Sequence, residues 1–326
     1  MKAMTCREWG DPSVLTLTEM PSPQLIPGHI RVRVRAAGIN FADTLQVAGK
    51  YQVKPPLPFT PGLEIAGDVL EIGPGVRKPF RIGQRVLGFL RFGGGYAEEL
   101  VAPEDSLLAI PDTLSDIDAG GFPTVYGTSY YALSWRGKLR PDETLLVLGA
   151  AGGVGLAAVE IGKQLGARVI AAAGGAEKCA LTLQYGADHA IDYTRESVRD
   201  RVRELTDGAG ADVVFDPVGG DAFDQAIRAT AWGARMLVIG FAAGRIQSVP
   251  ANLILVKNIA VTGVVFGAEN ERDPQSGGSF IAEMLRWQAA GKLRPRVAKT
   301  FPLDQAPAAL EALVSRKYAG KIVLTT

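Results

Sequence analysis

The chain has 326 residues, 47% of them hydrophobic, so it is long enough to bury a substantial core and to form two domains. Lys and Arg number 35 against 34 Asp and Glu, and the resulting net charge of +1 gives no global electrostatic basis for binding nucleic acid or a membrane surface. The N-terminus lacks an apolar signal region and no apolar run reaches the ~20 residues that span a bilayer, so a cytoplasmic location is expected.

Residues 1–123 consist of short alternating runs separated by Pro and Gly, a pattern typical of β-strands. Such runs predict strands at residues 14–18, 30–35, 63–72, 85–90 and 96–101. Together they favour a small barrel-like β domain. Arg31, Arg33 and Arg35 alternate with apolar residues, which indicates one solvated face of a sheet rather than a nucleic-acid-binding stripe.

From residue 124 the pattern changes to alternating strands and helices. A helix is predicted at residues 124–133, and apolar strands begin near residues 145, 168, 189, 212 and 235, with amphipathic helices such as 154–165 and 197–205 between them. Nearly continuous apolar runs are typical of strands that are buried on both faces of a parallel sheet. Short connections and right-handed crossovers then predict a doubly wound sheet.

The C-terminal part combines a sixth strand with elements expected to complete the first domain. The strand is predicted at residues 259–266, followed by helices at 279–290 and 304–315 and a terminal strand at 321–324. Because the last strand is expected to return to the β domain, the predicted domains are residues 1–123 with 267–326, and residues 124–266.

The most informative local pattern is a strand that runs directly into a cluster of glycines and then a helix. Residues 145–148 are apolar, and the following segment reads Ala150-x-Gly152-x-x-Gly155, which matches the G-x-G-x-x-G fingerprint except for its first glycine. Glycine lets the backbone approach a pyrophosphate closely, and the amides at the helix start attract its charge. The sequence thus predicts a nucleotide-binding turn, the alternative being a tight turn of another α/β fold.

The type of nucleotide depends on the end of the next strand, where an Asp or Glu would bind the ribose 2′-hydroxyl of NAD. Residues 171–175 are Ala-Ala-Ala-Gly-Gly instead, which leaves room for a 2′-phosphate. Lys178, Tyr193 and Arg316 are candidate partners for that phosphate, although Lys178 is also typical of a solvated helix position and Glu177 would repel the phosphate. NADPH is the favoured cofactor.

Two cysteines, Cys6 and Cys179, and two histidines, His29 and His189, are too few and too widely spaced for a disulfide framework or a closed zinc site. Chemistry without a metal is therefore expected.

These motifs extend along the whole chain, which resembles the zinc-independent medium-chain dehydrogenases/reductases of the quinone oxidoreductase (zeta-crystallin-like) group. The matching stretches are residues 37–43, 61–67, 83–86, 150–155, 215–220 and 320–324. The resemblance implies an α/β protein with a GroES-like β-barrel-type catalytic domain and a Rossmann cofactor domain. Zinc-dependent relatives carry a cysteine in place of Asn40 and a His-Glu pair in place of Leu63 and Glu64, so zinc-assisted alcohol oxidation is disfavoured.

The resemblance also implies roles for individual residues. It places Asn40 and Thr128 near the nicotinamide, and Gly152, Gly153 and Val154 at the pyrophosphate. Around the adenosine phosphate it places Gly174, Gly175, Lys178, Tyr193 and Arg316, and over the nicotinamide Phe241, Ala242, Val265 and Phe266. Tyr51 matches an aromatic residue of the substrate cleft, or else packs against Pro55 and Pro56. A second tyrosine found in some relatives is Leu45 here.

The leading hypothesis is an NADPH-dependent enzyme that transfers a hydride to a quinone. Asn40 and Tyr51 are the candidate catalytic residues, since an amide and a hydroxyl donate hydrogen bonds to the oxygen on which charge develops. Asp43 either orients Asn40 or caps the helix that begins there. Reduction of activated C=C bonds in enones or enoyl-CoA esters remains an alternative within the same class.

A hypothesis of another class is an NADPH-binding structural or RNA-associated crystallin-like protein. Its basic patch would comprise Arg195, Arg199, Arg201 and Arg203, but intervening acidic residues make an ordinary exposed helix the better interpretation, so no nucleic-acid partner is expected. The family tends to dimerise through edge strands of its cofactor domains. This predicts a homodimer joined at residues 259–265.

Overall fold

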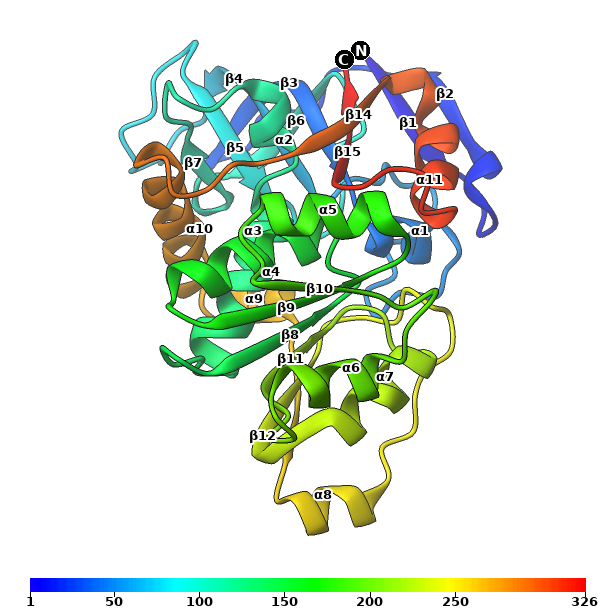
Figure 1. Cartoon of the computed structure of the whole chain (residues 1–326). Helices are drawn as coiled ribbons and strands as arrows, with labels where there is room; N and C mark the ends of the chain where they lie inside the picture. Colours follow the sequence, from blue (N-terminus) through cyan, green and yellow to red (C-terminus); the bar gives the residue numbers. More distant parts are fainter. The chain divides into compact units, whose positions relative to one another are not determined.

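The computed structural model describes the backbone of residues 1–326 and all side chains except those of Asn270, Glu271, Pro274 and Gln275. The chain forms two compact units, coloured along the sequence in Figure 1. The β unit comprises residues Met1–Thr124 and Gly267–Thr326, and the α/β unit comprises Val125–Phe266. No helix among the described residues is both long and apolar enough to cross a membrane.

A seven-stranded sheet forms the centre of the β unit. Its order is β14-β15-β3-β4-β5-β7, and β6 pairs with β3. The strands are β3 (His29–Ile39), β4 (Glu64–Ile72), β5 (Arg85–Phe89), β6 (Glu99–Pro103), β7 (Leu107–Ala109), β14 (Val297–Pro302) and β15 (Lys321–Thr325). A separate hairpin joins β1 (Lys2–Cys6) and β2 (Leu15–Glu19). This is a GroES-like arrangement.

Strand β3 shows how side-chain alternation builds this unit. Ile30, Val32 and Val34 are fully buried. Arg31 and Arg35, on the opposite face, form ion pairs with Glu71 at 3.3 Å and with Asp68 at 2.7 Å. The arginines therefore cover one face of the sheet.

Helical segments complete the β unit. They are η1 (Pro12–Val14), α1 (Phe41–Val47), η2 (Glu104–Ser106), α2 (Asp116–Gly120), α9 (Phe266–Arg272), α10 (Pro274–Ala289), η5 (Leu303–Gln305) and α11 (Ala306–Val314). Helix α1 follows β3 directly, so the end of this long strand positions the residues at the helix start.

The α/β unit is a doubly wound Rossmann sheet of six parallel strands in the order β10-β9-β8-β11-β12-β13. The strands are β8 (Thr144–Leu148), β9 (Arg168–Ala173), β10 (His189–Asp192), β11 (Ala211–Asp216), β12 (Thr230–Val238) and β13 (Ala260–Gly263). Its helical segments are α3 (Pro123–Tyr130), η3 (Tyr131–Arg136), α4 (Gly153–Gln164), α5 (Ala176–Gln184), α6 (Val198–Leu205), α7 (Gly220–Ala226), η4 (Ile227–Ala229) and α8 (Ala251–Lys257).

Strand order reverses between β8 and β11, because the chain winds outward from β8 to β10 and then crosses back to β11. In doubly wound sheets, ligands bind beyond the carboxyl ends of the strands at such a reversal. Every residue of β8 is buried, as expected for a central strand. The topology thus selects the loops after β8 and β11 as a candidate ligand site.

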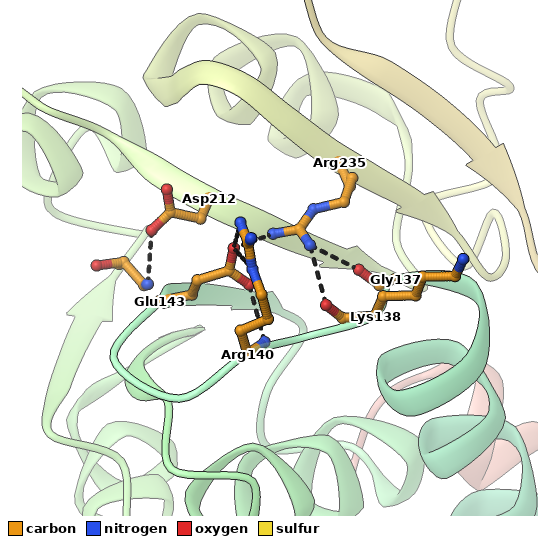
Figure 2. A network of polar contacts seen from close by, with 7 residues as sticks. Gly137, Lys138, Arg140, Glu143, Asp212 and Arg235 are labelled. Carbon is orange, nitrogen blue, oxygen red and sulfur yellow. Dashed lines mark hydrogen bonds and ion pairs between the residues drawn. The ribbon is translucent and has the colours of Figure 1, made fainter.

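The opposite, amino-terminal edge of this sheet carries an arginine–glutamate network (Figure 2). Glu143 forms ion pairs with Arg140 and Arg235, each at 2.7 Å, and Arg235 also donates to the carbonyls of Gly137 and Lys138. Burial acts to raise the pKa of Glu143, but the hydrogen bonds from both arginines lower it overall. The network lies at the edge away from the candidate ligand site and links the segment before β8 to β12.

Several elements differ from the sequence prediction. Strand β12 begins at Thr230 rather than near residue 235, because exposed Trp232 and the glycine at 233 interrupt the apolar run that is typical of a buried strand. Strand β6 begins at Glu99, since Ala97 makes only an isolated bridge with Ala3.

Candidate active site

The glycine turn after β8 has two kinds of glycine. Gly149 has a φ of +59°, and a Cβ on Gly155 would lie 2.4 Å from the Gly149 carbonyl oxygen, so both serve the backbone of the turn itself. Gly152 differs, since a Cβ there would meet only that carbonyl oxygen, at 3.4 Å, and the residue is exposed. Internal packing therefore does not explain Gly152, which leaves open space at the start of α4.

Ala150 occupies the first position of the fingerprint without disturbing the turn. The residue is fully buried, and its N–H donates to the carbonyl of Ala172 in β9 at 3.0 Å. Gly149, one residue earlier, adopts the left-handed conformation that the turn requires. The substitution by alanine is thus accommodated inside the sheet core.

Helix α3 is joined to α4, the helix after the glycine turn, by two side chains that sequence reasoning did not select. Ser129 donates its hydroxyl to the Val154 carbonyl at 2.9 Å, and Tyr126 donates to Glu160 at 2.7 Å. Thr128 lies on the same helix and is half-buried. The signal available in the sequence was polar residues within an otherwise apolar helix.

Four of the residues predicted at the adenosine phosphate follow β9 and β10: Gly174 and Gly175 come directly after β9, Lys178 lies in the first turn of α5, and Tyr193 comes directly after β10. The Tyr193 ring lies against Gly174, where a Cβ would meet its hydroxyl oxygen at 2.8 Å. Asp192, which ends β10, accepts hydrogen bonds from the Gly175 and Thr194 amides and from the Thr194 hydroxyl. One oxygen of this carboxylate, which was not anticipated, therefore joins the loop after β9 to the loop after β10.

The loop after β11 contacts the glycine turn, because a Cβ on Gly149 would lie 2.7 Å from a Val218 methyl carbon. Asp216 shapes this loop by accepting the amides of Val218 and Gly219 on one oxygen, both at 2.8 Å. Its other oxygen is buried without a hydrogen-bond partner among the described residues, and burial raises the pKa of the carboxyl.

Phe241, Ala242, Val265 and Phe266 follow the last two strands of the sheet. The Ala242 amide donates to the Pro217 carbonyl at 3.1 Å, which joins this segment to the loop after β11. Val265 is 58% exposed, whereas Phe266 is buried with its ring centroid 6.0 Å from that of Tyr131. Of Val265 and Phe266, only Val265 therefore exposes its side chain to a ligand within this unit.

In the β unit, Asn40 lies at the junction of β3 and α1, within a buried polar cluster. Its Oδ1 accepts from Lys321 Nζ at 2.6 Å, and its Nδ2 donates to Glu64 at 2.8 Å and to the Gly38 carbonyl at 3.4 Å. Lys321 and Glu64 also form an ion pair at 2.6 Å. Sequence reasoning missed Lys321.

Asp43, fully buried on α1, interacts with the backbone of Asn40 rather than with its side chain. One carboxylate oxygen accepts the Asn40 N–H at 2.7 Å and the Tyr96 hydroxyl at 2.8 Å, while the other has no partner among the described residues. Burial raises the pKa of Asp43 to about 7. The carboxyl therefore caps the N-terminus of α1 by accepting the Asn40 N–H.

Tyr51 follows α1, and its side chain is sufficiently buried to raise the pKa of its hydroxyl, with the Asp43 charge as the second cause. Arg316 also belongs to the β unit, where it is exposed after α11 with a φ of +54°. Among the described residues, no group of three or more His, Cys, Asp or Glu side chains is arranged to hold a metal ion.

A doubly wound sheet with a glycine turn at its reversal, joined to a GroES-like unit, defines a medium-chain dehydrogenase/reductase. Comparison with known protein families supports this class. Residues 26–112 match the family described as "Alcohol dehydrogenase GroES-like domain", and residues 153–281 match the family described as "Zinc-binding dehydrogenase". The chain belongs to the quinone oxidoreductase family of these proteins.

Membership in this family follows from relatives aligned over nearly the whole chain. The chain is 42% identical to the "Quinone oxidoreductase-like protein 2 homolog" of Nematostella vectensis, over 100% of this chain and 89% of the relative. It is 33% identical to the quinone oxidoreductase of Pseudomonas aeruginosa, over 97% of both chains. The structure of the Escherichia coli quinone oxidoreductase in complex with NADPH matches with a TM-score of 0.91 at 30% identity, over 100% of both chains.

Proposed function

We propose that this protein is an NADPH-dependent reductase that transfers a hydride to a quinone. The observation that carries the proposal is the open space at Gly152, at the start of α4 and beside the reversal of strand order. The neighbouring strand end offers Gly174 and Gly175, and one oxygen of Asp192, the carboxylate that ends β10, is engaged by the Gly175 amide and by Thr194. This combination fits a dinucleotide with a 2′-phosphate.

Residues of the α/β unit would hold the cofactor. Gly152, Gly153 and Val154 would bind the pyrophosphate with backbone amides, since the first turn of a helix has N–H groups without helical partners. Lys178 and Tyr193 would contact the 2′-phosphate, with Arg316 of the β unit as a further candidate. Thr128, Phe241, Ala242 and Val265 would surround the nicotinamide, and Phe266, whose side chain is buried, would contribute its backbone.

NADPH supplies the hydride, and the protein supplies hydrogen-bond donors for the acceptor. Reduction of a quinone consumes one hydride and one proton and yields a hydroquinone and NADP⁺. The negative charge that develops on the quinone oxygen would be stabilised by the Asn40 amide and the Tyr51 hydroxyl, with the proton completing the product from solvent.

The test is anaerobic NADPH oxidation with a panel of quinones and a panel of enones and enoyl thioesters. We expect quinones to give the highest kcat/KM. Absence of turnover with every acceptor would refute the proposed reductase function. Replacing Asn40 with alanine should lower kcat by roughly 10- to 100-fold and change the NADPH dissociation constant by less than about 3-fold. The exposed Asn252, replaced in the same way, is the control.

We also propose a homodimer joined through β13. This strand ends the six-stranded sheet, with β12 as its paired neighbour, and its residues are exposed or half-buried. A sheet edge of this kind is a template for pairing with a second copy. Replacing Ala260 and Thr262 together with aspartate would bring like charges face to face across a two-fold axis.

Light scattering should therefore give a mass near twice 34.5 kDa for the native protein and near 34.5 kDa for the double variant. Ala180→Asp, at an exposed position on α5, is a control that should remain dimeric. A native protein that is monomeric at micromolar concentration would contradict the proposed dimer.

A further inference from the structure

A buried cation, the ammonium group of Lys321, contacts the side chain of Asn40 in the β unit. Lys321, the first residue of β15, is 6% exposed, and its Nζ lies 2.6 Å from Asn40 Oδ1 and 2.6 Å from Glu64 Oε1. Glu64 is fully buried and also accepts the Thr124 amide on its second oxygen, at 2.8 Å. The lysine thus contacts the candidate catalytic amide, and the adjacent Glu64 carboxylate neutralises its charge.

Glycine backbone packs closely against this cluster, whose ion pair is buried. A Cβ on Gly38 would lie 2.2 Å from Glu64 Oε1, and a Cβ on Gly121 would lie 2.6 Å from the Lys321 Cγ. The ion pair is consequently shielded from water, and its field acts on Asn40 with little screening.

The charges determine which way the Asn40 amide faces. Its carbonyl oxygen lies against the ammonium, and one of its N–H groups points to the carboxylate. The flipped amide would set its NH₂ group against the lysine and its oxygen against the glutamate, which is repulsive at both ends. The remaining N–H makes a long, weak hydrogen bond of 3.4 Å to the Gly38 carbonyl. It is therefore the N–H group that can most readily donate to a ligand.

We propose that Lys321 is a positioning residue that fixes the Asn40 amide and strengthens its N–H as a hydrogen-bond donor; this inference rests on the proposed reductase function. A cation on the amide oxygen draws electron density from the nitrogen, so the N–H becomes more acidic and stabilises a developing oxyanion better. Glu64 holds the lysine in place and keeps the buried charge paired.

The test removes the pair together, because Lys321→Met alone would leave Glu64 buried without a partner. The double variant Lys321→Met, Glu64→Gln removes both charges and keeps one side-chain carbonyl, which can accept from Asn40 Nδ2, whereas the Thr124 amide loses its acceptor. We expect kcat with a quinone to fall roughly 10-fold, with KM and the NADPH dissociation constant changed by less than about 3-fold. An unchanged kcat would overturn the proposal.

The matched control is Lys163→Met, Asp188→Asn, which removes an ion pair of 2.7 Å in the α/β unit and should leave kcat unchanged. A second readout does not depend on turnover. The side-chain amide of Asn40, labelled with ¹⁵N and assigned by its loss in Asn40→Ala, should give proton resonances that shift toward those of a free amide in the charge-free double variant.

The two readouts separate the inference from the function on which it rests. If the native protein reduces no acceptor, the proposed reductase function fails, and the amide resonances still decide whether Lys321 positions Asn40. Resonances that are identical in the native protein and the charge-free double variant would overturn the positioning role.

Discussion

Replacing Gly155 with alanine is expected to raise the NADPH dissociation constant by at least about 100-fold, which corresponds to about 2.7 kcal/mol of binding free energy. The new Cβ would lie 2.4 Å from the Gly149 carbonyl oxygen and 2.7 Å from the Ala150 Cα. Both are backbone atoms of the glycine turn, so the start of α4 must move away from the end of β8. The amides proposed to bind the pyrophosphate would move with it.

Gly152→Ala provides the sharpest comparison, because its Cβ would meet only one protein atom, at 3.4 Å. This variant should keep the native thermal midpoint yet bind NADPH more weakly, whereas Gly155→Ala should lose both stability and affinity. Gly278→Ala, where a Cβ would meet no described atom within 4 Å, should leave NADPH affinity unchanged and raise the thermal midpoint slightly, because alanine is favoured over glycine inside helix α10. Fluorescence titration with NADPH and thermal unfolding measure the two effects, and native affinity in Gly155→Ala would contradict the proposed site.

The contrast between these glycines also shows what the sequence reveals and what it conceals. The strand–glycine–helix order is local, so the turn and the six parallel strands were predictable from contiguous apolar runs. The β unit was harder to predict, because β7 has only three residues and β14 has a mixed burial pattern. Such strands exist through their pairing with distant segments, which periodicity does not detect.

The candidate active site divides in the same way. Asn40 was accessible through family resemblance, but Lys321 is 281 residues away in sequence and occurs in what the sequence showed only as a terminal strand. Glu64 matched a residue of the zinc-dependent relatives, and its ion pair with that lysine required the fold to bring β4 and β15 beside β3. Charges that meet only through sheet topology have no local signature.

Asp43 is expected to make the protein less stable as the pH rises from about 4 to about 7. Below its ordinary pKa of 3.8 the carboxyl is neutral in both folded and unfolded chains. Between that value and about 7 the unfolded chain ionises while burial keeps the folded carboxyl protonated, so unfolding becomes progressively more favourable. Above about 7 both states are ionised, and the loss levels off at roughly 4 kcal/mol.

Asp43→Asn isolates this effect, because asparagine resembles the neutral carboxyl and its oxygen still accepts from the Asn40 amide and the Tyr96 hydroxyl. We expect the variant to match the native protein in urea unfolding near pH 5 and to exceed its free energy of unfolding by a few kcal/mol at pH 8. Asp105→Asn, an exposed carboxylate in an ion pair of 3.2 Å with Lys78, is the control. Equal stability of native protein and Asp43→Asn at pH 8 would show that Asp43 ionises normally, and the buried carboxyl oxygen without a partner would then need another source of compensation.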